Sequence, residues 1–518
     1  MKPTKIVLFI VLILGGLLSM AFFFPKEGIQ ITDDWVLHFP TIDELMENPD
    51  ENVVDISEII ANNKVSEDSL DDEEESLTAV VLEDSSVIYY SPIEINPEEV
   101  TRKLEFPDNK KDILYPFFKE LSQIKSNGKL IRVLHYGDSQ IEADRVSSYL
   151  RTKLQGQFGG SGPGLIPAIQ PYGFESPVLL DHSDGWIRYP GFGKRDTMVD
   201  HSRYGILASF STYAPYQNAA VADSVEEKSK DENDQQIHEE WLKIMHSPYS
   251  SRNVNKYSQF RLFYGYNKYP VDFKLFAADQ EIDSKILPPA DGLQIKRWTF
   301  ENTPEYLRLE FKGQDSPEIY ALALDGDHGV AVDNIPLRGS SGTVFTNSNQ
   351  QLLRAIYQDL NAKLLIMQFG GNVAPTMSDN YDHYHRSFYN QLVTLKRLIP
   401  GVTIIVIGLA DMSLKEKDQY VSYPNILVIR DALKGAAFKA NCAFWDTYEA
   451  MGGKNSMPSW VFSDPPLAEK DFIHFTIKGS RVIAQMFYKA LMLEYNNYFS
   501  ENIRNKIPTK GNAQLSSN

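Results

Sequence analysis

The sequence predicts a three-layer α/β domain that is interrupted by an inserted antiparallel β-sandwich. Short apolar runs alternate with helical segments in two separate parts of the chain, which is the pattern of a parallel sheet with helices on both faces. Between these parts lies a stretch rich in Tyr, Phe, Gly, Ser and Asn, with short alternating runs. At 518 residues, the chain is also too long for one ordinary domain.

The first β/α unit follows an amphipathic helix predicted at Ile113–Ile124. The apolar run Ile131–Tyr136 predicts a buried strand, Gly137-Asp138-Ser139 a turn, and Ile141–Leu154 a helix. The same alternation of strands and helices resumes downstream. Strands are predicted at Leu364–Phe369, Val402–Leu409 and Ala443–Trp445, and helices at Tyr384–Leu398, Ile426–Lys439 and Ile477–Leu493. Ligands of such sheets lie outside the carboxyl ends of the strands, so the turns after these strands are where we expect functional residues.

The inserted domain is predicted at residues 171–317, inside a discontinuous α/β domain at 87–170 and 318–500. Its alternating runs are typical of an antiparallel β-sandwich. They include Gln259–Tyr264, Val271–Phe276 and Tyr306–Phe311. The acidic segment Asp223–Glu240 within it is expected to be a floppy loop.

The N-terminus has the composition of a membrane anchor. Lys2 and Lys5 precede an apolar run, Ile6–Phe24, which is nearly long enough to cross the roughly 30 Å hydrocarbon core of a bilayer. The run ends in three phenylalanines, a poor cleavage site, so we expect an uncleaved anchor at residues 1–26 rather than a cleaved signal peptide. The two lysines favour a single-pass inner-membrane protein whose folded part lies on the periplasmic side.

The charge of the chain is unevenly spread. The 51 Lys and Arg residues and the 69 Asp and Glu residues give a net charge of −18, which argues against nucleic acid as the main partner. Sixteen acidic residues and one basic residue, Lys64, lie between Thr41 and Asp84. We therefore expect residues 27–86 to form a largely disordered acidic tether, and residues 501–518 a disordered tail. The single cysteine, Cys442, excludes an intramolecular disulfide and a multi-cysteine metal site.

Two positions offer a nucleophile and its base. Ser139 follows a predicted strand and begins a helix, where backbone N–H groups and the positive end of the helix dipole gather. A nucleophilic serine needs a base, usually a histidine held by a carboxylate, and Asp471-Phe472-Ile473-His474 provides such a pair. Each feature also has an ordinary structural explanation, since serine is a favoured helix N-cap and His474 fits an exposed loop.

Two further turns offer hydrogen-bond donors for an oxyanion. Asn372 lies in a glycine-flanked turn after Leu364–Phe369 and places a side-chain amide at a strand end. The segment Arg338-Gly339-Ser340-Ser341-Gly342 provides glycine N–H groups with no side chain to obstruct approach. Four turns at predicted strand ends therefore hold a nucleophile, an acid–base pair and two kinds of donor. This conjunction favours a catalytic site over four unrelated structural roles.

At these residues the sequence resembles the SGNH, or GDSL-like, hydrolase superfamily over Ile131–Gln170 and Ala321–Leu493. The resemblance implies a flavodoxin-like three-layer fold, with Ser139 as nucleophile, His474 as base and Asp471 as the carboxylate that orients it. It implies no metal ion and no cofactor.

The resemblance also implies an oxyanion hole. The Ser139 N–H, the Gly342 N–H and the Asn372 side chain would form it, and Gly339 stays open as an alternative to Gly342. Two positions depart from the family pattern: Val373 stands where an acidic residue is usual, and Gln140 where a leucine is usual.

The inserted β domain and the membrane tether resemble the peptidoglycan O-acetylesterase branch of this superfamily. This resemblance implies an outward-facing serine esterase that removes O-acetyl groups from an acylated cell-envelope polysaccharide. Trp186, Trp241 and Trp298 are able to stack on sugar rings, although such residues more often belong to the core of a sandwich.

Two other functions share these sequence features. An O-acetyltransferase would use the same acyl-serine intermediate, with an acyl-supplying membrane acyltransferase partner and a sugar hydroxyl in place of water. A glycan-binding protein with an inactive hydrolase domain is the third interpretation, and the complete set of candidate residues argues against it.

Overall fold

The computed structural model describes residues 3–25, 29–32, 35–37, 54–63, 79–81, 88–90, 93–173, 177–216, 236–417 and 419–503. The chain divides into two compact units, Met1–Val53 and Val54–Asn518. Most of the predicted acidic tether, most of the loop predicted at Asp223–Glu240 and residues 504–518 of the predicted tail lie outside the described residues.

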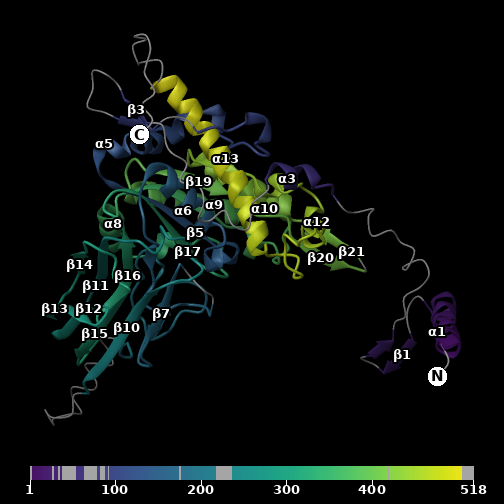
Figure 1. Cartoon of the computed structure of the whole chain (residues 1–518), viewed down its shortest axis with the longest axis horizontal. Coiled ribbons are helices and arrows are strands. Elements are labelled where there is room, and N and C mark those ends of the chain that lie inside the picture. Colours follow the sequence, from purple (N-terminus) through teal and green to yellow (C-terminus); the bar gives the residue numbers. More distant parts are fainter. Residues whose placement is uncertain are drawn as a thin grey trace. The chain divides into compact units, whose positions relative to one another are not determined.

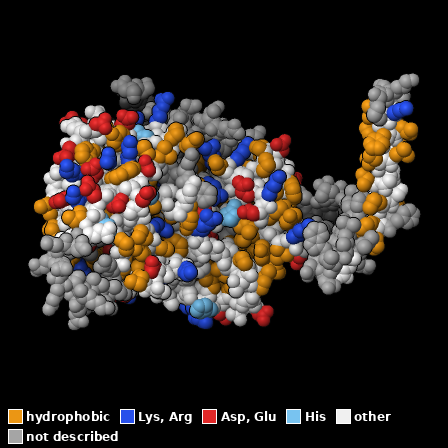
Figure 2. Space-filling view, turned by 90° about the horizontal axis from the view of Figure 1, so that it is seen from below, with side chains coloured by type: hydrophobic (Ala, Val, Ile, Leu, Met, Phe, Trp, Pro, Cys, Tyr) orange, Lys and Arg blue, Asp and Glu red, His pale blue; other side chains and the backbone are white. Residues whose placement is uncertain are grey.

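The first unit contains the apolar helix α1 (Pro3–Phe23) and a small antiparallel pair, β1 (Ile29–Thr32) and β2 (Trp35–Leu37). Within α1, Lys5–Phe22 has a mean hydropathy of 2.5 and is long and apolar enough to cross a membrane. Its large apolar side chains are exposed along its length (Figure 2). An anchor and a signal sequence both meet this criterion of length and composition.

The second unit is built on a five-stranded, all-parallel sheet, so the predicted α/β fold is confirmed. Its strands, in spatial order, are β17 (Gly329–Pro336), β5 (Leu130–Gly137), β18 (Ala362–Gln368), β19 (Thr403–Ile407) and β22 (Ala443–Trp445). The first strand of the sheet along the chain, β5, therefore lies second in space, between β17 and β18. This is the doubly wound order in which a ligand crevice forms at the carboxyl ends of the strands.

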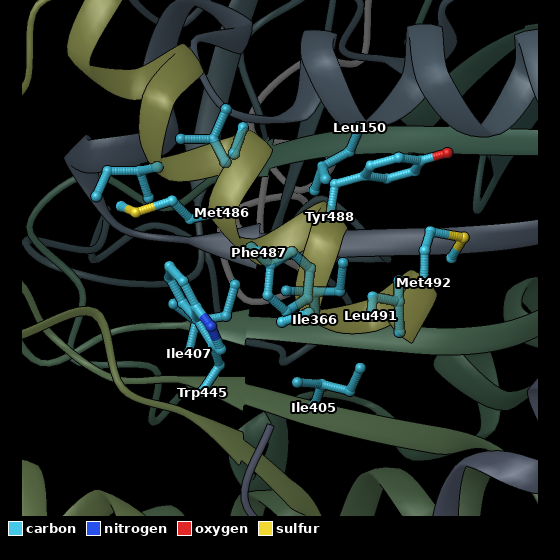
Figure 3. Close-up of a cluster of buried hydrophobic side chains, with 14 of the residues drawn as sticks. Leu150, Ile366, Ile405, Ile407, Trp445, Met486, Phe487, Tyr488, Leu491 and Met492 are labelled. Atoms are coloured by element: carbon cyan, nitrogen blue, oxygen red, sulfur yellow. The ribbon is translucent and has the colours of Figure 1, made fainter. Parts of the chain in front are cut away.

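One face of the sheet is covered by the C-terminal helix. Phe487 and Leu491 of α13 (Ile477–Asn502) pack in one buried cluster with Ile366 and Ile405, which come from β18 and β19 (Figure 3). This cluster also receives side chains from α4 (Tyr115–Ser122) and α6 (Ser147–Phe158). The long helix crosses the sheet in Figure 1 and continues nine residues beyond the predicted end at Leu493.

The opposite face of the sheet belongs to a second buried cluster. Successive side chains of a strand point to opposite faces, so Leu365 of β18 enters this cluster while its neighbour Ile366 enters the first. Three amphipathic helices cover this side: α8 (Gln350–Asp359), α9 (Asp382–Leu398) and α10 (Ile426–Lys439). Both faces are buried, which explains why the strands read as continuous apolar runs.

The inserted domain consists of two antiparallel sheets with a third buried cluster between them. One sheet has the order β13 (Gln280–Leu287), β12 (Val271–Ala277), β15 (Tyr306–Gly313), β10 (His238–His246) and β7 (Val178–His182). The other has the order β14 (Leu293–Thr299), β11 (Gln259–Gly265), β16 (Glu318–Asp325), β9 (Ser209–Thr212) and β8 (Ile187–Pro190), with β6 (Gly164–Ile166) also paired to β16. The strands gather at one end of the unit in Figure 1.

The boundaries of the inserted domain differ from the predicted 171–317. Strand β16 pairs with β11 and β6 and so belongs to the sandwich, whereas the sequence places residues 318–325 in the α/β domain. Leu322 and Leu324 belong to the buried cluster inside the sandwich, whereas Tyr320, Ala321 and Ala323 belong to the cluster on the parallel sheet. A strand buried on both faces has no alternation, so its sequence resembles a strand of a parallel sheet.

The predicted tether contains an ordered element. Helix α3 (Ser57–Asn62) lies within residues 27–86, and Ile56 at its start belongs to the buried cluster beneath α13. The buried Asn63 side chain donates a hydrogen bond to Thr101 Oγ1 (3.2 Å), and Lys489 Nζ donates to the Asn62 carbonyl (2.7 Å). The described part of this segment, residues 54–63, is therefore packed on the folded domain.

Candidate active site

Three strands end at the same level of the parallel sheet. Gly137, the last residue of β5, is paired with Pro336 of β17 on one side and with Gln368 of β18 on the other. The turns that carry Ser139, Gly339–Gly342 and Asn372 therefore leave the sheet at one edge. The loop before α13 brings His474 to this edge from the far end of the chain.

Ser139, His474 and Asp471 form a continuous chain of hydrogen bonds. Ser139 Oγ lies 2.8 Å from His474 Nε2, and His474 Nδ1 lies 2.6 Å from Asp471 Oδ2. The second contact fixes the tautomer in which Nδ1 carries the proton, so Nε2 faces the serine as a base. This is the arrangement in which a histidine removes the proton of an attacking serine.

The position of Asp471 is fixed by its own loop. Asp471 Oδ1 accepts hydrogen bonds from the backbone N–H groups of Ile473 (2.9 Å) and His474 (3.0 Å), which leaves Oδ2 for the imidazole. Burial raises the pKa of this carboxyl, but the hydrogen bonds from the His474 side chain and backbone outweigh burial and hold the pKa below its ordinary value. Asp471 therefore stays ionised at neutral pH.

The turn after β5 is shaped to present Ser139. Asp138 caps the 3₁₀ segment η5 (Ser139–Asp144) by accepting a hydrogen bond from the Gln140 N–H (3.0 Å). The helix predicted at Ile141–Leu154 starts only at Ser147, because Ala143 and Asp144 adopt the left-handed conformation with φ of 55° and 61°. The sequence gives only a weak signal of this backbone reversal, since Asp is enriched in the left-handed region but Ala is not.

Two side chains that no sequence motif identifies join the serine turn to the histidine loop. Gln140 donates to the Ile473 carbonyl (2.6 Å) and accepts from the Phe475 N–H (3.4 Å), so it holds the backbone on both sides of His474. Arg145 donates to the Ser139 carbonyl (3.3 Å) and to the Phe475 carbonyl (3.2 Å). The one available signal was that Gln140 replaces the usual leucine.

The candidate oxyanion donors differ in whether they already make a hydrogen bond within the protein. Asn372 Nδ2 donates to the Ser340 carbonyl (3.2 Å), which holds the amide beside the 337–342 turn. The Gly342 N–H donates to Ser340 Oγ (3.1 Å), whereas the Gly339 N–H makes no hydrogen bond to any residue that the structure describes. Gly342 has φ of 79°, and a Cβ there would lie 2.7 Å from the Phe369 ring, so only glycine fits. Their roles as donors stay predictions.

Asp138 lies beneath the site and is almost fully buried. Burial raises the pKa of its carboxyl to about 6, and hydrogen bonds from the Gln140 and Gly371 N–H groups offset only part of this effect. Asp138 therefore ionises near the lower end of the physiological range, unlike the exposed carboxylates of the chain.

The tryptophans of the sandwich do not form one exposed surface. Trp186 is buried against Tyr213 and Phe311, and Trp298 stacks on Phe260 with a centroid distance of 5.3 Å. The Arg308 guanidinium lies over the Trp241 ring, with its carbon 5.4 Å from the ring centroid. Within the described ranges, no group of three or more His, Cys, Asp or Glu side chains is placed to hold a metal ion.

Comparison with known proteins gives structural matches only. No family model matches the sequence, and no curated protein matches it. A solved structure described as a peptidoglycan O-acetylesterase is 17% identical, and the match covers 74% of this chain and 96% of that one with a TM-score of 0.56.

Two other matches have lower TM-scores. A family two carbohydrate esterase from Clostridium thermocellum is 9% identical over 51% of this chain and 93% of its own, with a TM-score of 0.22. A GDSL-like lipase from Bacteroides ovatus is 9% identical over 61% and 98%, with a TM-score of 0.22. The match to the O-acetylesterase structure shows that this chain shares its fold, which agrees with the predicted α/β domain interrupted by an antiparallel β domain.

Proposed function

We propose that this chain is a membrane-anchored, outward-facing serine esterase that removes O-acetyl groups from a cell-envelope polysaccharide such as peptidoglycan. One observation carries the proposal: Ser139, His474 and Asp471 are linked by hydrogen bonds of 2.8 and 2.6 Å at the carboxyl edge of an SGNH-type sheet. The similarity to a peptidoglycan O-acetylesterase structure supports the choice of substrate, and the apolar helix α1 supports the anchor.

The reaction divides into two steps. In the first, Ser139 Oγ attacks the acetyl carbonyl while His474 Nε2 accepts its proton, and Asp471 stabilises the imidazolium. When the tetrahedral intermediate collapses, His474 returns the proton to the departing sugar oxygen, which leaves acetyl-Ser139. In the second step, His474 activates a water molecule, and acetate leaves as the serine is regenerated.

The oxyanion of each intermediate needs donors near Ser139. The Ser139 N–H and the second Nδ2 hydrogen of Asn372 are the first candidates. The Gly339 N–H has no other partner among the described residues, whereas the Gly342 N–H serves only if Ser340 Oγ releases it. Each well-aimed donor is worth about 3–4 kcal/mol of transition-state stabilisation.

Acetate release from O-acetylated peptidoglycan tests the proposal. We expect the purified full-length chain to release acetate, and Ser139→Ala to lower the rate at least about a thousandfold. Ser148→Ala, a serine on helix α6, is the matched control and should keep the activity. Acetate that appears only on an added sugar acceptor would instead identify a transferase, and no Ser139-dependent product in either assay would refute a catalytic role.

A further inference from the structure

A cavity of about 60 Å³ lies beside the candidate active site, where the sandwich meets the parallel sheet. The α/β domain contributes Asn334 from β17 and the carboxylates Glu142 and Asp144 from η5, and the inserted domain and its entry segment contribute Tyr172, Arg188 and Ser209. Most of the remaining wall is apolar and includes several prolines. A concave site with a few convergent polar groups on an apolar wall is the usual form of a ligand subsite.

Arg188 is a partly buried cation without a matching anion. Its Nε donates to Ser209 Oγ (3.2 Å), and no carboxylate among the described residues lies within ion-pair distance of its guanidinium. Burial lowers the pKa of this guanidinium, and the Tyr172 hydroxyl offsets the effect only in part. A guanidinium carries five N–H donors, so Arg188 keeps donors for a ligand in the cavity.

Glu142 provides an acceptor in the same cavity. Only 2% of this residue is exposed, and its Oε1 accepts no hydrogen bond from any described residue. The Nε of Arg338 lies 3.5 Å from this oxygen, and the Arg338 guanidinium lies over the Tyr172 ring at 5.1 Å. A buried carboxylate oxygen without a hydrogen bond is costly unless a ligand satisfies it, and a sugar hydroxyl is a suitable donor.

The cavity is connected to the nucleophile by short contacts. Glu142 lies three residues after Ser139 in the same 3₁₀ segment, and Arg145 from the end of this segment donates to the Ser139 carbonyl. The Glu142 carboxylate lies 4.0 Å from Arg145 and 3.5 Å from Arg338, and Asp144 pairs with Arg151. Arg188 is therefore the charged residue of the cavity lining that has no ion-pair partner among the described residues.

We propose that the cavity binds the carboxylate of an acidic sugar residue next to the acetylated position, with Arg188 as the residue that holds the carboxylate and Glu142 as the acceptor of a sugar hydroxyl. The proposal rests on the esterase function for the identity of the polymer, but not for the binding itself. A planar guanidinium matches a carboxylate with two parallel hydrogen bonds. A phosphate monoester carries nearly two negative charges and would meet stronger repulsion from Glu142.

Binding measurements on the full-length Ser139→Ala protein test the subsite without the reaction. The probe is a fluorescent oligogalacturonate. The reference ligand is the same oligosaccharide with every carboxylate reduced to an alcohol. We expect the acidic probe to bind at least about tenfold more tightly than the reduced one. Arg188→Gln should abolish this difference, Arg188→Lys should retain part of it, and the control Arg308→Gln, on the exposed side of the sandwich, should retain all of it.

The thermal midpoint of each variant separates binding from folding. Arg188→Gln removes a partly buried charge that has no carboxylate partner, so its unfolding temperature should not fall below that of the parent protein. Equal binding of the two probes, or a difference that survives Arg188→Gln, would overturn the proposal. Equally tight, Arg188-dependent binding of the reduced oligosaccharide carrying phosphate monoesters would overturn the choice of carboxylate. A failure to release acetate in the Ser139 assay would leave these binding results unaffected.

Discussion

Arginine side chains serve two different purposes at the two ends of strand β5. Near the amino end, Arg132 is fully buried and lies 2.6 Å from both Asp325 and Asp333. Beyond the carboxyl end, Arg188 lines the cavity beside Ser139 and has no carboxylate partner among the described residues. Arg132 is thus matched by two carboxylates, whereas Arg188 has none among the residues that the structure describes.

The network of buried ion pairs around Arg132 joins the two domains. Arg261 of β11 lies 2.7 Å from Asp325 and 3.0 Å from Asp359, so the network extends from the sandwich to the helices of the α/β domain. Paired buried charges fix the position of one domain on the other, because any shift would leave a charge unpaired in a region without water. An unpaired cation at the rim of a cavity costs stability and is better explained by a ligand.

The largest expected effect is the loss of stability on replacing Arg132, the paired arginine near the amino end of β5. We expect Arg132→Met to lower the free energy of unfolding by about 3–5 kcal/mol, because it leaves Asp333 buried without its cation. Denaturant unfolding measures this loss, while acetate release per folded molecule at low temperature should stay within about twofold. Arg308→Met removes an exposed ion pair with Glu310 and should change stability by less than about 0.5 kcal/mol. A loss of activity without a loss of stability in Arg132→Met would contradict the assignment.

The pH dependence of stability should show the raised pKa of Asp138, which lies near the carboxyl end of β5. Its pKa rises from 3.8 to about 6 on folding, so the folded state gains stability from the protonated form below pH 4 and loses it as the pH rises through 6. Relative to Asp138→Asn, the wild-type free energy of unfolding should therefore fall by about 2 kcal/mol between pH 4 and pH 7. Unfolding midpoints over this range provide the measurement.

Asp471 provides a control of opposite sign for that experiment. Its pKa is lowered in the folded state, so its contribution is present above the ordinary value near 4 and is lost as the pH falls below it. The difference between wild type and Asp471→Asn should therefore shrink in acid. Parallel profiles for the Asp138 and Asp471 variants would show that the two carboxylates do not have opposite environments.

The smallest expected effect concerns Gln140. Gln140→Leu restores the usual residue of the superfamily but removes both hydrogen bonds to the backbone beside His474. We expect kcat to fall about tenfold with little change in KM, because the base is less well aligned with Ser139. The control is Gln155→Leu, which should affect stability and not kcat. Gln155 is buried away from the site, donates a hydrogen bond to the Gly162 carbonyl and accepts one from the Asn253 side chain. Full kcat in Gln140→Leu would show that packing alone positions the loop.

The sequence alone determined the parts that depend on local chemistry. Apolar periodicity located the parallel strands and most of their helices, because the period of side-chain exposure reflects secondary structure. It also identified the turns that carry Ser139, Asn372 and His474, since each directly follows a strand signal or precedes a helix. The pair Asp471 and His474 is local as well, because the two residues are only three positions apart in one loop.

Only the tertiary structure decided which distant segments meet. The register of Gly137 with Pro336 and Gln368 aligns the turns at one edge, and the contact of Gln140 with the His474 loop joins residues more than 300 positions apart. The cavity at Arg188 needs both domains in place, and the sequence could not show that β16 belongs to the sandwich. Such contacts depend on the packing of whole elements, so a local pattern of residues does not encode them by itself.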